Sequence, residues 1–130
     1  MDLDELVATM PHAVALGVTL SEADAARVAG SVAWAEERCT IGGLLHGGVL
    51  MAFADSLGAV CAFLNLPAGA RTVTIESKTN FLGAVREGTV TARARPLHVG
   101  KTTIVVETDV LDASGRRVAR TTQTQAVLGD

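Results

Sequence analysis

The chain has 130 residues, of which 48% are hydrophobic and 19% charged, and its formal net charge at pH 7 is −3. These values are typical of a globular protein and exclude intrinsic disorder, collagen-like repeats and coiled coils. A slightly acidic chain with 3% aromatic residues has neither the positive field nor the stacking surface that nucleic-acid binding requires. The length predicts a single domain over residues 1–130.

The cysteines and histidines predict neither a disulfide framework nor a metal site. Cys39 and Cys61 are far apart and belong to no paired motif. His12, His46 and His98 lack the spacing of metal ligands. The N-terminal segment is acidic, whereas a signal peptide begins with basic residues. We therefore expect a reduced, cytoplasmic protein without a metal.

The first third of the chain predicts one short helix and two strands. Residues 2–9 have apolar positions at helical spacing, and Pro11 is expected to end this helix. Residues 14–20 and 26–34 have the composition of strands, and the polar residues 21–24 predict a turn between them.

The middle of the chain predicts one long apolar helix. Between Arg38 and Arg71, the only formally charged side chain is that of Asp55. Residues 48–66 suffice for about five helical turns. A run of about 20 apolar residues can also span a membrane, but a central aspartate and the surrounding strand patterns favour a buried core helix.

The last part of the chain alternates in the manner of β-structure. Four strands are predicted, at residues 72–82, 88–99, 102–111 and 117–128. The breaks at residues 99–101 and 112–115 are short and typical of hairpins. Four consecutive strands of this kind predict an antiparallel sheet. Packing of the helix on one face of a strongly curved sheet gives an α+β fold.

Asp55 is the most informative residue of the predicted helix. Its neighbours on the same face are mostly small, namely Met51, Ala52, Gly58 and Ala59. The opposite face carries residues that fill a core, namely Leu50, Phe53, Leu57, Val60, Cys61 and Leu64. Small residues let a ligand or another backbone approach, and burying a carboxylate without partners is costly. This pattern favours a chemical role; the alternative is an aspartate at the solvent edge or capping a neighbouring backbone.

His46, Gly47 and Gly48 immediately precede the predicted helix. The first N–H groups of a helix lack intrahelical partners and carry partial positive charge. Glycines there allow a polar oxygen to approach those N–H groups. The arrangement is suited to binding an anion or polarising a carbonyl group. The alternative is that the glycines only provide a flexible entry to the helix.

The segment from Leu45 to Asp55, with HGG followed by six residues and Asp, resembles the signature of hotdog-fold acyl-CoA thioesterases of the phenylacetic-acid pathway (PaaI) type. The similarity extends over most of the chain. It implies a hotdog fold, in which a curved antiparallel β-sheet wraps one long central helix. It also implies hydrolysis of an acyl-CoA, with aromatic acyl groups as leading substrates and no cofactor beyond the coenzyme A (CoA) moiety of the substrate.

The resemblance implies roles for the motif residues. The N–H of Gly47 would bind the thioester carbonyl and stabilise the oxyanion, and His46 would shape the loop. Asp55 would act either as a general base or as a nucleophile. In the family the active site is shared between subunits, so Asp55 would face the partner's Gly47. A dimer, and a tetramer built from two dimers, are therefore expected.

Further residues are implied to contact the substrate or its water, namely Gly48, Thr40, Thr74, Ala59, Lys101 and Thr102. Thr40 stands where the family often has Asn or Gln, and Thr74 matches a residue that helps to orient water in relatives. Ala59 replaces a Thr of the Glu-bearing hydroxybenzoyl-CoA branch, which favours the Asp-bearing branch. Lys101 with Thr102, at a tight turn, is the preferred contact for the CoA phosphates, ahead of Arg93, Arg95 and His98.

Two other functions remain open at this point. A hotdog hydratase or dehydratase would need a histidine as acid or base opposite a carboxylate, and His46 lies at the helix entrance. A non-catalytic module would bind acyl-CoA without releasing a thiol. The predicted partners are an acyl-CoA and further copies of the chain, with no nucleic acid and no membrane.

Overall fold

The computed structural model describes residues 1–129. Its α-helices are α1 (Leu3–Ala8), α2 (Pro11–Leu16) and α3 (Gly47–Phe63). Its strands are β1 (Thr19–Ala23), β2 (Val28–Ala33), β3 (Arg71–Phe81), β4 (Thr89–Val99), β5 (Thr103–Leu111) and β6 (Arg117–Leu128). Two single-turn 3₁₀ helices, Glu36–Arg38 and Ile41–Gly43, lie between β2 and α3.

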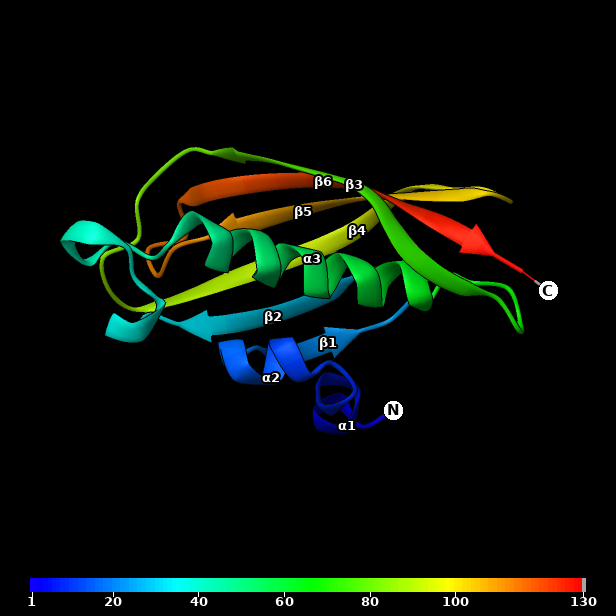
Figure 1. Cartoon of the computed structure of the whole chain (residues 1–130), viewed down its shortest axis with the longest axis horizontal. Helices are drawn as coiled ribbons and strands as arrows, with labels where there is room; N and C mark the ends of the chain where they lie inside the picture. Colours follow the sequence, from blue (N-terminus) through cyan, green and yellow to red (C-terminus); the bar gives the residue numbers. More distant parts are fainter. Residues whose placement is uncertain (130) are drawn as a thin grey trace.

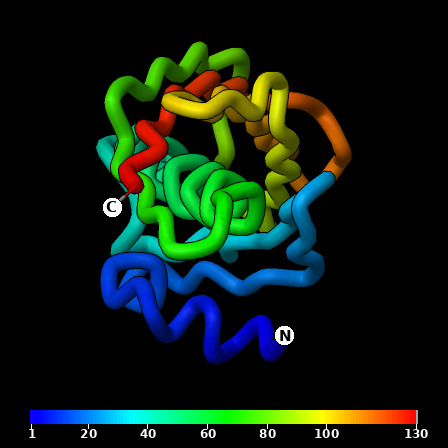
Figure 2. The backbone as a smooth tube through the Cα atoms, turned by 90° about the vertical axis from the view of Figure 1, so that its right-hand side faces the viewer, coloured from blue at the N-terminus to red at the C-terminus, as the bar shows by residue number. Residues whose placement is uncertain are grey.

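The strands form one antiparallel sheet in the order β1-β2-β4-β5-β6-β3 (Figure 1). The sheet curls around α3, which contacts every strand from β2 to β6. Seen along the helix, α3 lies inside this curl (Figure 2). The α+β prediction, with one long central helix wrapped by a curved antiparallel sheet, is therefore confirmed. The sheet remains open, with β1 and β3 as its edges.

The core lies between α3 and the concave face of the sheet. Phe53, Leu57 and Cys61 of the helix are completely buried, as are Ile104 and Val106 of β5. The packing face expected for the helix is thus confirmed for these residues. No helix within residues 1–129 has the length and apolar character needed to cross a membrane.

The strand expected over residues 14–20 is wrong in its first half, because α2 extends through Leu16 and β1 begins only at Thr19. Pro11 begins this helix rather than ending α1, since proline at the first helical position lacks only an N–H that would have no partner there. Gly17 ends it in the left-handed conformation, with φ of 82°. Val14, counted as a strand residue from sequence, points to solvent with 53% exposure.

The predicted turn at residues 21–24 is displaced toward the C-terminus, because β1 continues through Ala23. The chain reverses at Asp24, whose carboxylate accepts the N–H groups of Ala26 and Arg27 at 2.8 and 2.9 Å. This side-chain-to-backbone bonding is what favours aspartate in turns.

The third predicted strand does not pair with the fourth, as a run of hairpins would require. β3 pairs with β6 along its whole length, whereas β4 lies between β2 and β5. The connection after β3 stays on β6 at first, because the N–H groups of Leu82 and Gly83 both bond to the carbonyl of Val118 at 2.8 and 3.2 Å. It then crosses to the other side of the helix. β3 is thus an edge strand of the sheet, and its residue Thr74 lies beside Asp55.

Candidate active site

The start of α3 presents one unpaired amide. The Nδ1 atom of His46 accepts the Gly48 N–H at 2.8 Å, and the backbone carbonyl of His46 accepts the Val49 N–H at 2.9 Å. The N–H of Gly47 has no hydrogen-bond partner within residues 1–129. The predicted Gly47 donor is therefore available to an incoming oxygen, while the Gly48 amide is occupied by the histidine.

Asp55 lies two turns further along α3 and is half-buried. Its Oδ1 atom accepts hydrogen bonds from Thr74 Oγ1 on β3 at 3.3 Å and from Gln123 Nε2 on β6 at 3.2 Å. Its Oδ2 atom has no partner in the described part of the chain. The register of β3 shifts between Thr74 and Glu76, and such bulges redirect side chains. The structure thus brings the predicted residues Asp55 and Thr74 together.

The glutamines beside Asp55 were not predicted. Gln123 and Gln125 are buried and joined by a 3.1 Å hydrogen bond, and Gln125 Nε2 also donates to Thr72 Oγ1 at 3.2 Å. The signal in the sequence is the alternation in β6, which puts Thr121, Gln123 and Gln125 on the same inward face as Ala119. Amides at inward positions of a strand need hydrogen-bond partners, and Asp55 is one of these partners.

Two adjoining cavities open beside Asp55. The first has a volume of about 330 Å³ and lies between α2 and α3, where His12, Ser56 and Ala59 line it with Asp55. The second, of about 380 Å³, continues along α3 to Phe63 and is lined mainly by apolar groups. Ala59 borders both cavities, and its role in substrate binding stays a prediction.

A third cavity, of about 330 Å³, lies at the start of α3. Thr40, Gly47 and Phe81 line it, so the predicted contacts Thr40 and Gly47 share one space. A Cβ atom on Gly47 would lie 3.2 Å from the Phe81 ring. The absence of a side chain at residue 47 therefore keeps this cavity open next to the free amide.

Other predicted residues lie apart within one chain. Gly47 and Asp55 are eight residues apart on one helix, which is about 12 Å. Lys101 and Thr102 lie in the turn between β4 and β5, at the opposite end of the molecule from the start of α3 (Figure 1). The structure does not bring this turn to Gly47. Arg95 projects from β4 and is bonded to Glu107 at 2.8 Å.

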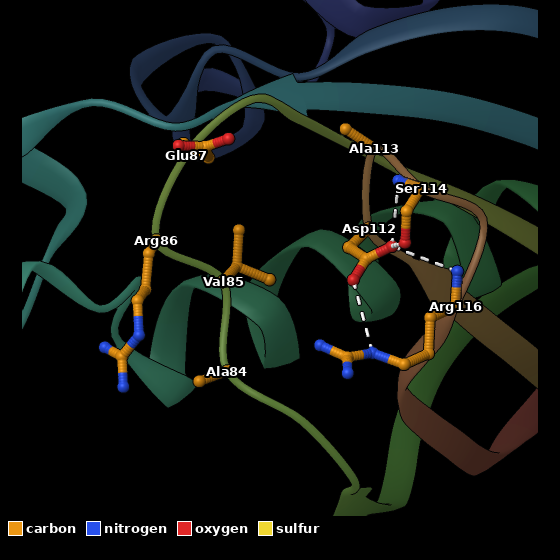
Figure 3. A pocket seen from close by; sticks show the side chains of 8 residues that line it. All are labelled: Ala84, Val85, Arg86, Glu87, Asp112, Ala113, Ser114 and Arg116. Atoms are coloured by element: carbon orange, nitrogen blue, oxygen red, sulfur yellow. Dashed lines mark hydrogen bonds and ion pairs between the residues drawn. The ribbon is translucent and has the colours of Figure 1, made fainter.

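A cavity of about 280 Å³ lies between the β3–β4 connection and the β5–β6 turn (Figure 3). Asp112 in its wall accepts the N–H groups of Ser114 and Arg116, both at 3.0 Å, and the Ser114 hydroxyl at 2.6 Å. Its other oxygen pairs with Arg116 Nε at 3.4 Å. The Ser114 hydroxyl and these N–H groups lower the pKa of Asp112. The Asp112 carboxylate therefore stabilises the β5–β6 turn.

Neither a reactive thiol at Cys61 nor a metal-binding cluster is found within residues 1–129. Cys61 is buried in the core, and burial, with a smaller effect of the Asp24 charge, raises the pKa of its thiol to about 11. Its predicted position on the apolar side of the helix is confirmed. Within residues 1–129, no three His, Cys, Asp or Glu side chains are grouped so that they could hold a metal ion.

Solved structures of thioesterases are similar to this chain over almost its whole length. A mutant thioesterase from Pseudomonas aeruginosa has a TM-score of 0.91 at 30% identity, covering 98% of this chain and 94% of its own. A thioesterase from Haemophilus influenzae has a TM-score of 0.93 at 26% identity, covering 99% and 92%. These similarities agree with the hotdog fold that the resemblance implies.

Curated relatives match a shorter segment. The 1,4-dihydroxy-2-naphthoyl-CoA hydrolase of Escherichia coli is 34% identical over 86 residues, which are 66% of this chain and 63% of the relative. The proofreading thioesterase EntH of Klebsiella pneumoniae is 37% identical over 87 residues, 67% of this chain and 64% of the relative. The aligned segments therefore span less than two thirds of these relatives.

A sequence model of the thioesterase superfamily matches residues 42–119. This range covers more than half of the chain and includes α3, with Gly47 and Asp55, as well as Thr74. Assignment to the PaaI type within the superfamily stays a prediction. The match and the fold together establish that the chain belongs to the thioesterase superfamily.

Proposed function

We propose that the protein hydrolyses an acyl-CoA thioester to the free acid and CoA. The observation that carries this proposal is the position of Asp55. It is a half-buried carboxylate on an otherwise uncharged helix, with one oxygen free of partners and a largely apolar cavity beside it. A carboxylate so placed can act on a substrate or on its attacking water.

The reaction needs one base or nucleophile and one carbonyl-polarising donor. As a general base, Asp55 would take a proton from water while the water oxygen attacks the thioester carbon. As a nucleophile, it would form a mixed anhydride that water then hydrolyses. In both routes the carbonyl oxygen gains negative charge, which the Gly47 N–H would stabilise. The C–S bond then breaks and CoA leaves as a thiolate, which takes up a proton.

The proposed site is formed by two chains. About 12 Å separate Gly47 from Asp55 on one helix, which is too far for both groups to act on one carbonyl carbon. Large apolar residues on the edge strand β3, namely Val73, Ile75 and Phe81, are between 50% and 61% exposed. An exposed apolar strand edge favours association with another chain. A dimer that places Gly47 of one chain opposite Asp55 of the other would complete the site; a tetramer stays a prediction.

The proposed acyl group is aromatic. The cavities that begin at Asp55 and continue along α3 are lined by apolar groups such as Met10, Val60 and Phe63. The naphthoyl-CoA specificity in the name of the E. coli relative supports an aromatic substrate. Apolar pockets of this kind hold flat rings through contact area and recognise few polar groups.

Release of free thiol from a series of CoA esters tests this proposal. We expect phenylacetyl-CoA and benzoyl-CoA to have higher kcat/KM values than short or long aliphatic esters. Release that is fastest from an aliphatic ester would contradict the aromatic assignment alone. Hydration of crotonyl-CoA without thiol release would instead identify a hydratase, and binding of acyl-CoA without turnover a binding module.

A further inference from the structure

The hydrogen bonds around Asp55 differ in how many protons their donors can supply. The Thr74 hydroxyl has one proton and two acceptors, Gln125 Oε1 at 2.5 Å and Asp55 Oδ1 at 3.3 Å. The shorter contact takes that proton most of the time. Gln123 Nε2 has two protons and therefore bonds to Asp55 and Gln125 at once. Gln123 is the constant donor to the carboxylate.

Space for Gln123 is provided by the helix that carries Asp55. Gly58 lies three residues after Asp55 and is buried, and a Cβ atom there would overlap the Gln123 carboxamide. At Gly58, the face of small residues predicted around Asp55 thus admits a side chain of β6. The missing side chain admits an amide from β6, and this amide reaches Asp55 from the side of the core.

Gln123 is a poor choice for stability alone. Its side chain is completely buried, and its Oε1 atom accepts no hydrogen bond within the described residues. A buried acceptor without a partner is unfavourable, whereas an apolar side chain of the same shape would avoid this cost. The hydrogen bond from Gln123 to Asp55 compensates for this cost.

We propose that Gln123 is a positioning residue for Asp55, a role that rests on the proposed hydrolysis. By holding Oδ1 toward β6, Gln123 leaves Oδ2 as the oxygen that acts on the substrate or its water. Gln125 fixes the orientation of the Gln123 amide by accepting its second proton. An acid held in one orientation reacts faster than one that samples several, since misplacement by about 1 Å can cost 100-fold in rate.

The test replaces Gln123 by methionine, which has a similar shape and no amide. We expect kcat to fall about 10- to 100-fold, with KM and the dissociation constant for CoA itself within twofold of the wild-type values. The melting temperature should not fall. Gln123→Asn, which retains an amide one methylene shorter, should lose kcat equally and serves if the methionine variant does not fold.

Thr121→Val is the matched control. Thr121 is buried on the same face of β6, and its hydroxyl bonds to Thr79 Oγ1 at 2.7 Å rather than to Asp55. Loss of this buried polar group should leave kcat unchanged. An equal loss of kcat in Thr121→Val and Gln123→Met would overturn the proposal, because the effect would then belong to the whole strand.

A double-mutant cycle separates positioning from a general structural effect. In the Asp55→Asn background, Gln123→Met should cause no further loss of residual kcat, since there is no carboxylate left to hold. Independent losses, or wild-type kcat in Gln123→Met, would overturn this role while leaving the hydrolysis proposal intact. A wild-type chain that releases no thiol from any ester would overturn the hydrolysis proposal and this role with it.

Discussion

Asp55 and Asp109 are both half-buried carboxylates bonded to side chains of β6, and they lie on opposite faces of that strand. On the inner face, Asp55 receives neutral donors, an amide and a hydroxyl. On the outer face, Asp109 bonds to Arg120 at 2.8 and 3.3 Å and pairs with Arg117 at 3.1 Å. The inner face of β6 thus binds a carboxylate through the amide of Gln123, whereas its outer face binds one through the guanidinium groups of Arg117 and Arg120.

The difference bears on what each acid can do. Burial by itself raises the pKa of Asp109, but the hydrogen bond from Arg120 and the charges of Arg120, Arg117 and Arg95 outweigh it and lower the pKa below its ordinary value. Arg120 bonds to both of its oxygens, and the lowered pKa makes Asp109 a weaker base than an ordinary aspartate. Asp55 has only neutral donors, and its Oδ2 atom has no partner within residues 1–129. The inner acid is suited to chemistry and the outer one to stability.

Substitution of the Asp55 carboxylate should have the largest effect on kcat. Asp55→Asn is expected to lower kcat at least about 100-fold, the loss typical of a missing general base, without lowering the melting temperature. Thiol release and thermal unfolding measure the two quantities. Unchanged turnover would remove Asp55 from the mechanism and erase the contrast with Asp109.

The free amide of α3 can be removed by replacing Gly47 with proline. Proline is tolerated at the first helical position, and His46 already has the extended backbone, with ψ of 136°, that a residue before proline prefers. Gly47→Pro should reduce kcat about 100-fold, as expected when an oxyanion donor is lost.

Gly47→Ala is the control for this substitution, because it keeps the N–H and adds a Cβ near the exposed Phe81 ring. Its kcat should exceed that of the proline variant by at least about tenfold. Equal losses in both variants would show that the space at residue 47 matters and its amide does not.

The outer acid should affect stability and leave turnover unchanged. At pH 7, Asp109→Asn is expected to lower the free energy of unfolding by about 1 kcal/mol. A folded-state pKa below the ordinary value means that Asp109 contributes its full stabilisation above about pH 4 and loses it as the pH falls further. Urea unfolding at pH 7 and pH 3 should show the difference between variant and wild type shrinking at the lower pH. A constant difference would exclude the ion pairs as its source.

The smallest effect is expected in a comparison of the reactivities of the two cysteine thiols. Cys39 is half-buried, whereas Cys61 is completely buried with its thiol pKa raised to about 11. A thiol reagent at neutral pH should label Cys39 and leave Cys61 unlabelled until the protein unfolds. Peptide mapping by mass spectrometry distinguishes the two. Rapid labelling of Cys61 in the native protein would show that the core beneath Asp55 opens.

The local elements of the site could be predicted from sequence, since their signals are local. An uncharged run flanked by glycines predicts α3, and the HGG motif with its spaced aspartate predicts the two groups that the proposed hydrolysis uses. The strand prediction for residues 14–20 was partly wrong because Val and Thr favour strands, whereas Pro11 and Gly17 set the boundaries of a helix that includes residues 14–16. Local preference gave way to these two backbone constraints.

The long-range partners of the site could not be predicted in this way. Pairing of β3 with β6 joins distant segments, and no hairpin signal marks it. The bond between Gln123 and Asp55 depends on this sheet order and on the space at Gly58. An inward amide in β6 is visible in the sequence, but its partner is defined only once the helix lies across the strand.

The contact between Gly58 and Gln123 has a consequence for anyone who redesigns this protein. Since the amide fills the place where a methyl group would stand, a larger residue 58 requires the Gln123 amide to move away from its present position. In a mutant library that varies position 58 alone, glycine should be the most frequent residue among the active members. If positions 58 and 123 vary together, a larger residue 58 can be combined with a smaller amide or hydroxyl side chain at 123. Such pairs would change the hydrogen bonding around Asp55.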